Sequence, residues 1–253
     1  MTVRELFEEE LRQRNISFRL DAATGRHALE AQGTEFLISL DNLERDFSLD
    51  GDTGRVERFV DAVLATSHAS DGPFSPDQFY WCLEPNDYEV HADFRAPVSD
   101  GVDRVLVYLS RDNRLITWVT PDMLDSLALG ETKAGTLGFR NLTEALQEAT
   151  IEYQDIDGVR LGYIGTSLPF KASLLLAPNL REIVGSIIGW PLMAVAPDRD
   201  FLYLWAARHT DFVQRVGGVV VREFQNASYP LSTEVYQITD TGIRAVGAFP
   251  TPA

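Results

Sequence analysis

Two stretches of this chain follow the same order of local signals, and that order limits the fold more than any other feature of the sequence. YLSRDNRLITWVTPDML (residues 108–124) and VAPDRDFLYLWAARHTDFV (residues 195–213) each pass from an apolar strand through an Asp-containing turn to a Trp-containing strand and then to a helix that begins after Thr. A further hairpin signal follows each helix. The sequence therefore predicts two tandem β-β-α-β-β units, at about residues 104–165 and 179–248. Together they predict an α+β fold with antiparallel sheets and helices packed on one face.

The region before these units has its own helix and strand signals. Apolar residues recur at helical spacing in residues 2–14 and in residues 53–66, which predicts two amphipathic helices. Short apolar stretches between them predict a small sheet, with strands at residues 17–20, 27–31 and 36–40. Residues 69–76, ASDGPFSP, are small and polar with Gly and Pro, which is typical of a linker. We therefore expect an N-terminal region over residues 1–70 and a larger one over residues 77–253.

The charge of the chain argues against two classes of partner. Its 253 residues carry a formal net charge of −16, and such a surface repels phosphate groups. Neither nucleic acid nor a membrane is therefore expected as a partner. The stretch MTVRELFEEELRQRN lacks the apolar segment of a signal peptide, so we expect a cytoplasmic protein. Of the 22 basic residues only Lys133 and Lys171 are lysines, which we interpret as the arginine-rich usage of a GC-rich bacterium.

The Asp-Arg-Asp stretch within MAVAPDRDFLYLW has two interpretations. Asp198 and Asp200 have the spacing of carboxylates that hold a metal ion or a sugar nucleotide. They also lie between two apolar strands, where Pro197 and Asp198 are common turn residues, because Pro fixes φ and Asp hydrogen-bonds its own backbone. The equivalent turn of the first unit has Asp112 alone. This favours the turn of a β-hairpin.

Histidines and further carboxylates provide weaker candidates. The histidines lie far apart in the sequence, at His27, His68, His91 and His209. His209 precedes a predicted helix, and we interpret it as a solvated residue near the helix cap. The loop NDYEVHADFR surrounds His91 with carboxylates, at Asp87, Glu89 and Asp93. Such a loop can hold a divalent cation loosely, but a solvated loop is the favoured interpretation.

The remaining candidates point to structure more than to chemistry. Cys82 follows Trp81 within a predicted strand, so we expect a buried and unreactive thiol. GYIGTSLPFKAS (residues 162–173) contains Lys171 but lacks the Gly before Lys that a phosphate-binding loop requires, and we expect a connecting loop. The aromatic residues of the predicted strands are expected in the core, with an aromatic binding face as the alternative: Phe79, Tyr80, Trp81, Trp118, Trp190, Tyr203 and Trp205.

The order of these elements resembles the YtpQ family of uncharacterised bacterial proteins (domain of unknown function 1444). The similarity runs nearly end to end. It includes SFRLDAATGRHALEA leading to ISLDNL, then RLITWVTPDML followed by FRNL, and finally NLREIVGSIIGWPLMAVAPDRDFLYLWA. These are structural patterns without a catalytic signature. The resemblance implies a cytoplasmic bacterial protein and carries over no functional residue.

The sequence assigns no catalytic, cofactor-binding or metal-binding residue, and it implies no cofactor. The favoured hypothesis is a non-enzymatic binding or adaptor protein whose partner is another protein. A hydrolase or transferase with an acidic site is the first alternative, drawing on Asp198 and Asp200 or on the loop around His91. The second alternative is an acidic immunity or decoy protein for a basic partner.

Overall fold

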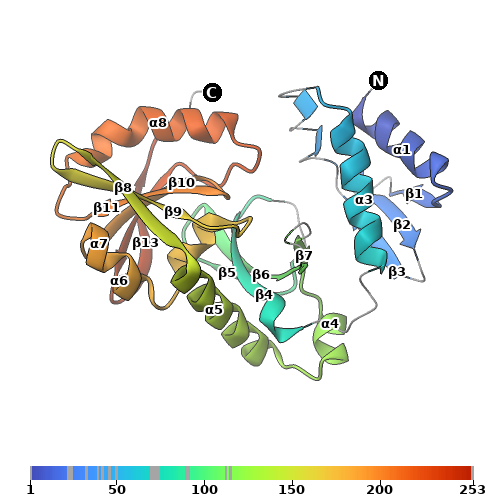
Figure 1. Cartoon of the computed structure of the whole chain (residues 1–253), viewed down its shortest axis with the longest axis horizontal. Coiled ribbons are helices and arrows are strands. Elements are labelled where there is room, and N and C mark those ends of the chain that lie inside the picture. The colour runs from blue at the N-terminus through green and yellow to red at the C-terminus, as the bar shows by residue number, and fades with distance from the viewer. Residues whose placement is uncertain are drawn as a thin grey trace. The chain divides into compact units, whose positions relative to one another are not determined.

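The computed structural model divides the chain into two compact units, Met1–Pro73 and Phe74–Ala253 (Figure 1). It describes residues 2–21, 25–31, 34–38, 40, 43–44, 47–48, 51–68, 75–88, 92–111, 113 and 116–251. Side chains are described at these positions except 30–31, 34–37 and 65–68. Within the described part of the chain, no helix is long and apolar enough to cross a membrane.

In the described part of the first unit, Met1–Pro73, helices α1 (Val3–Gln13) and α3 (Gly54–His68) pack with a small sheet. Helix α1 begins with a capping box between Thr2 and Glu5. Strands β1 (Phe18–Leu20), β2 (His27–Ala31) and β3 (Thr34–Ile38) form an antiparallel sheet in the order β1-β2-β3. The core of the unit combines the apolar stripe of α1 with residues from β2 and α3: Val3, Phe7, Leu11, Leu29, Val56 and Val60.

The second unit contains two antiparallel sheets. The smaller sheet consists of β4 (Phe79–Pro85), β5 (Arg95–Pro97), β6 (Val102–Leu109) and β7 (Ile116–Trp118), and β6 pairs with each of the other three. The preceding turn η2 covers Pro76–Gln78, and the short helix α4 covers Pro121–Ser126. The long helix α5 (Glu131–Glu148) packs on β4. It approaches closely because Gly135 and Gly138 leave room for Trp81, whose indole nitrogen donates to the Gly135 carbonyl at 2.8 Å.

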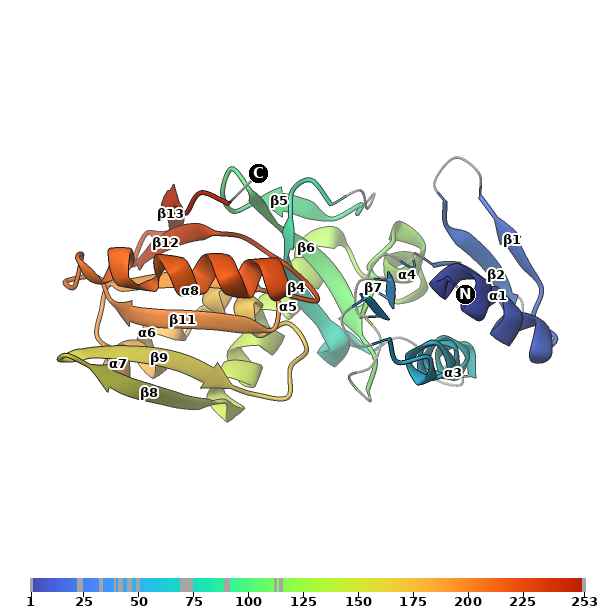
Figure 2. The ribbon, with the colours of Figure 1, turned by 90° about the horizontal axis from the view of Figure 1, so that it is seen from above.

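The larger sheet has six strands in the order β13-β12-β10-β11-β9-β8. Figure 2 labels these strands except β10. Its strands are β8 (Thr150–Ile156), β9 (Val159–Gly165), β10 (Leu192–Asp198), β11 (Phe201–Ala206), β12 (Glu234–Thr239) and β13 (Gly242–Ala248). Strands β8 and β9, β10 and β11, and β12 and β13 form three hairpins. Strands β8 and β13 are therefore the two edges of the sheet.

Helices cover both faces of this sheet, which corrects the expectation of helices on one face. Met193 and Val195 of β10 pack with helix α8 (Phe212–Asn226), whereas Leu192 and Ala194 lie in the core on the other face. That second face is covered by η3 (Lys171–Leu176), α6 (Leu180–Ile183) and α7 (Gly185–Ile188). Successive side chains of a strand point to opposite faces, and all residues of β10 before Asp198 are buried. Both faces are thus core, and the fold is α+β.

The predicted tandem units are distributed over the two sheets. The hairpin signals of the first unit become β6 and β7 in the smaller sheet, while the hairpin after α5 becomes β8 and β9 in the larger one. All four strands of the second unit lie in the larger sheet. The structure does not confirm two repeat units, because the first contains two helices, α4 and α5, between its hairpins where the second contains only α8, and its strands belong to different sheets. The helix expected over residues 179–189 is divided into α6 and α7.

Candidate functional site

Asp198 is the last residue of β10, and Arg199 and Asp200 form the turn to β11. Its carboxylate accepts a hydrogen bond from the backbone nitrogen of Asp200 at 2.6 Å and a longer one from the backbone nitrogen of Tyr229 at 3.5 Å. Strand pairing resumes at Phe201 after a register shift. Asp198 therefore has the backbone-bonding role of a hairpin turn that the sequence favoured.

Arg199, between the two aspartates, is the unexpected residue of this turn. Its side chain is only 13 % exposed, and its guanidinium lies 4.0 Å from the centre of the Tyr229 ring and 3.5 Å from Oε1 of Glu84. The backbone of Arg199 donates to the carbonyl of Tyr229 at 2.9 Å and accepts from the nitrogen of Ala172 at 3.0 Å. The hairpin tip is thus fixed to strand β4, to η3 and to the segment before β12.

Glu84 and Cys82, which are both buried, complete a group that we call the Glu84–Arg199 cluster: Cys82, Glu84, Ser173, Arg199, Asp200 and Tyr229. The Cys82 thiol donates to Glu84 at 3.5 Å, and the Ser173 hydroxyl accepts from the backbone nitrogen of Leu83 at 2.9 Å. Burial raises the pKa of the Cys82 thiol well above its usual value, and the nearby Glu84 carboxylate adds to this. Burial also raises the pKa of Glu84, which Arg199 only partly offsets. A fully buried thiol with a raised pKa is a poor nucleophile, as the sequence predicted.

Asp200 is the most accessible carboxylate of the cluster. Burial raises its pKa to about 6, although the charge of Arg199 opposes this shift. Its Oδ1 atom is buried and has no hydrogen-bond partner, and it lies 4.0 Å from Nε of Arg199. Asp200 therefore changes charge at mildly acidic pH, which affects stability and is not by itself a catalytic arrangement.

Those of the other sequence candidates that the structure describes do not form one site. Asp87 and Asp93 are exposed, and Glu89, His91 and Asp112 lie outside the described residues. His209 is partly buried before α8, while the side chain of His68 is also not described. Lys171 begins η3, so the expected connecting loop is partly helical. Among the residues that the structure describes, no group of three His, Cys, Asp or Glu side chains could hold a metal ion.

Most of the aromatic candidates lie in the core, as expected. Phe79 and Trp205 are fully buried, and Trp81 is buried beneath α5. Tyr80, Trp118 and Trp190 are partly buried against the same core. These side chains support the packing of the two sheets and do not form an exposed aromatic face.

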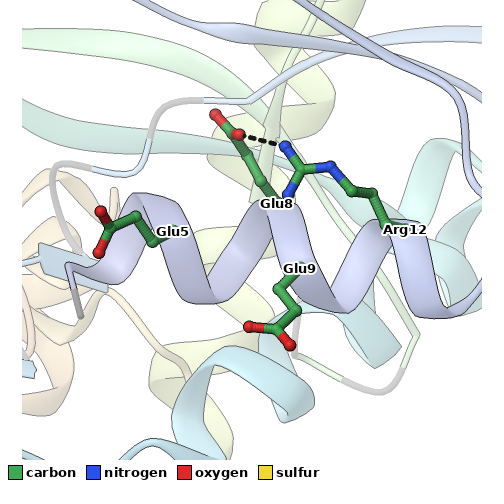
Figure 3. A pocket seen from close by; sticks show the side chains of 4 residues that line it. All are labelled: Glu5, Glu8, Glu9 and Arg12. Atoms are coloured by element: carbon green, nitrogen blue, oxygen red, sulfur yellow. Dashed lines mark hydrogen bonds and ion pairs between the residues drawn. The ribbon is translucent and has the colours of Figure 1, made fainter.

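A pocket on helix α1 is lined by Glu5, Glu8, Glu9 and Arg12 (Figure 3). Its carboxylates already have partners within the first unit. Glu5 caps the backbone of Thr2, and Glu8 contacts Arg12 at 2.7 Å and the buried Nε2 of His27 at 3.2 Å. Burial by itself raises the pKa of Glu8, but hydrogen bonds from His27 and Arg12 outweigh it and lower the pKa. These groups stabilise the first unit. No local sequence signal indicated that His27 is buried.

Strand β8 is the best candidate for a contact surface. All seven of its residues pair with β9 without a register shift, and only Ile151 and Ile156 are not exposed. Tyr153 is 46 % exposed and Tyr163, on the neighbouring strand, is 38 % exposed. The two strands are joined by Asp157 and Gly158, whose positive φ angles of 52° and 79° are those of a type I′ turn.

The hairpin geometry determines which backbone groups of β8 face away from the sheet. In a hairpin with a two-residue loop, the pair that flanks the loop exchanges hydrogen bonds, here Ile156 and Val159. Because antiparallel pairs alternate, Ile151, Tyr153 and Asp155 direct their N–H and C=O groups outward. These groups form the pattern to which a further strand pairs.

The chain matches no protein-family model, no curated protein and no solved structure. The resemblance to the YtpQ family therefore stays a prediction, and function must be argued from the site.

Proposed function

We propose that this chain is a protein-binding module that captures an extended segment of its partner at the exposed edge strand β8. The observation that carries this proposal is the regular seven-residue pairing of β8 with β9, which leaves the backbone groups of three alternate residues facing outward. An exposed sheet edge binds extended peptides because backbone hydrogen bonds continue the sheet. The exposed Tyr153 beside this edge adds apolar contact area.

The opposite edge of the sheet has features that disfavour such pairing. The pairing of β12 with β13 shifts register between Val235 and Tyr236, which leaves Val246 without a partner on β12. Strand β13 also begins with Gly242 at φ 122° and contains Gly247. Bulges and glycines are common at edges that do not accept another strand, because they twist and weaken the edge. Strand β8 has neither feature.

A binding role also agrees with the positions of the chemically active residue types. Cys82, Glu84 and Arg199 bind one another beneath the hairpin tip, and Glu8 and His27 do so within the first unit. We infer that these contacts serve folding, and that a free, buried Cys82 suits the reducing bacterial cytoplasm.

The test is a proline at an outward-facing position. Tyr153→Pro removes an N–H group that faces away from β9, so it should abolish peptide capture while β8 and β9 stay paired. A phage-displayed library of random nine-residue peptides, panned on the immobilised full chain, provides the probe. Tyr153→Ala is the matched control, because it removes the same ring but keeps the amide.

We expect peptides enriched on the wild-type chain to bind the alanine variant more weakly and the proline variant not at all. Amide hydrogen exchange should show bound peptide protecting Ile151, Tyr153 and Asp155. Equal binding by the wild-type and proline chains would place the contact elsewhere and overturn the proposal. Circular dichroism and the cooperativity of unfolding check that the proline variant remains folded.

A further inference from the structure

We infer that the segment bound at β8 is antiparallel to it and carries two cationic residues three positions apart, with an apolar residue immediately before the second. This inference rests on the proposed function, and it names the chemistry of the partner. It depends on the charges of β8, on the fixed position of Tyr153 and on the alternation of side chains along a strand.

Two carboxylates of β8 are exposed at the sheet edge and form no ion pair in the described part of the chain, since Arg160, the cross-strand neighbour of Asp155, contacts the Tyr153 ring and a backbone carbonyl instead. Glu152 accepts a hydrogen bond from the Tyr163 hydroxyl at 2.8 Å, and Asp155 accepts one from the backbone nitrogen of Gly158 at 2.9 Å. Both of these hydrogen-bond donors are neutral groups. Asp157, in the turn, differs because Arg215 contacts it at 2.7 Å.

Tyr153, between these carboxylates, is held in place by Arg160. The Arg160 guanidinium lies 4.7 Å from the centre of the Tyr153 ring, and its NH1 group donates to the carbonyl of Ile187 at 2.5 Å. The exposed ring therefore has a fixed support on the face of the sheet that α7 covers. A fixed, half-exposed ring favours an apolar or aromatic side chain opposite it.

The positions on β8 determine the spacing on the bound segment. Glu152 and Asp155 are three residues apart and lie on opposite faces of the strand, so cations opposite them are also three residues apart. In an antiparallel pair the order is reversed, and the residue opposite Tyr153 comes directly before the cation opposite Glu152. The expected motif is cation, any residue, apolar residue, cation. Antiparallel pairing is expected because every strand pair in this sheet is antiparallel, and such pairs are the more stable kind.

Charge also argues against a second copy of this chain as the occupant. Each copy carries a formal net charge of −16, and β8 itself contains two acidic residues and no basic one. Pairing two copies along β8 would bring four carboxylates together. A cationic segment of another protein neutralises the same groups.

The experiment measures binding of synthetic peptides to the full chain by fluorescence anisotropy. The probe is a nine-residue peptide with the central motif Lys-Thr-Tyr-Lys, and the comparison peptides replace its second Lys by Glu or reverse the motif. We expect the cationic peptide to bind at least tenfold more tightly than either comparison peptide. Glu152→Lys should weaken it at least tenfold and should restore binding of the Glu-containing peptide. Glu152→Gln is the control that removes the charge and keeps the shape.

The outcomes separate this inference from the proposed function. If all three peptides bind equally and Tyr153→Pro abolishes their binding, strand addition stands and the charge inference is wrong. If none binds and library peptides are also insensitive to Tyr153→Pro, the proposed function itself fails. Self-association in analytical ultracentrifugation that Tyr153→Pro abolishes would identify a second copy as the occupant and overturn the inference.

Discussion

Arg199 and Arg12 each contact a glutamate, but their surroundings give the two contacts different consequences. The shorter contact, 2.7 Å between Arg12 and Glu8, lies at the surface, where the Arg12 side chain is 61 % exposed. The longer one, 3.5 Å between Arg199 and Glu84, joins side chains that are 13 % and 11 % exposed. Water screens the first pair, whereas the second pair has lost most of its hydration. Burial, and not distance, therefore decides which contact the fold depends on.

The largest expected effect follows from removing the buried cation. Arg199→Ala leaves the Glu84 carboxyl buried without its partner and also removes the contact with Tyr229. We expect the free energy of unfolding to fall by about 3–5 kcal/mol, measured by urea denaturation.

The double variant Glu84→Gln with Arg199→Met is the matched control. It removes both charges and retains most of the volume, so most of the lost stability should return. If Arg199→Ala lowers the free energy of unfolding by less than about 1 kcal/mol, the buried pair does not hold the hairpin tip.

The next effect concerns the buried histidine of the first unit. Glu8→Ala leaves Nε2 of His27 unpaired beside Nδ1, which already has no hydrogen-bond partner. We expect a loss of about 1–2 kcal/mol at pH 7, measured by amide hydrogen exchange of α1 in the full chain. The lowered pKa of Glu8 stabilises the fold above the usual carboxyl pKa of about 4, and this contribution is lost as pH falls through the lower folded value. Glu9→Ala is the control, and an equal loss there would contradict the role of His27.

Asp200 should show the opposite dependence on pH. Its pKa is raised to about 6, so the ionised form is disfavoured in the folded chain. The protonated form stabilises the fold at low pH, and this advantage is lost as pH rises through about 6. Asp200→Asn should therefore melt at a higher temperature than the wild type at pH 8, with the difference disappearing towards pH 4.

The side chain of Asp200 is 41 % exposed, so the gain should stay under about 1 kcal/mol. Differential scanning calorimetry at both pH values, with the exposed Asp100→Asn as control, measures it. A difference between the Asp200 variant and the wild type that is independent of pH would show that packing, and not ionisation, is responsible.

The smallest effect is expected at the exposed arginine. Arg12→Ala removes the contact with Glu8 but leaves His27 in place, so the change should not exceed about 0.5 kcal/mol in urea denaturation. It should decrease further in high salt. A loss as large as that of Arg199→Ala would remove the distinction between the two pairs.

The local elements could be predicted from the sequence because their signals are local. Helix α1, the β8–β9 hairpin and the backbone role of Asp198 depend on a few neighbouring residues. The burial of Arg199 could not be predicted, because its partners Glu84 and Tyr229 are distant in the sequence and arginine is usually exposed.

The position of β8 at the sheet edge was likewise beyond local signals. The β8–β9 hairpin was predicted. Which of its strands lies at an edge depends on how the three hairpins are arranged in the sheet, and only the structure shows that arrangement. Helices on both faces were missed because both alternating sets of β10 residues are apolar, a pattern that does not indicate which element covers each face.

The pairing between β9 and β11 determines how firmly the β8–β9 hairpin is attached to the rest of the sheet. Registered pairing there is limited to Leu204 and Gly162, and Gly162 has no side chain because Ile188 of α7 lies directly over it. The attachment of this hairpin to the sheet therefore depends largely on β9 side chains that lie in the two cores, among them Ile164 and Val159. A partner segment that pairs with β8 binds only while the β8–β9 hairpin is attached to β11. By thermodynamic linkage, its binding at β8 would therefore also stabilise the pairing of β9 with β11.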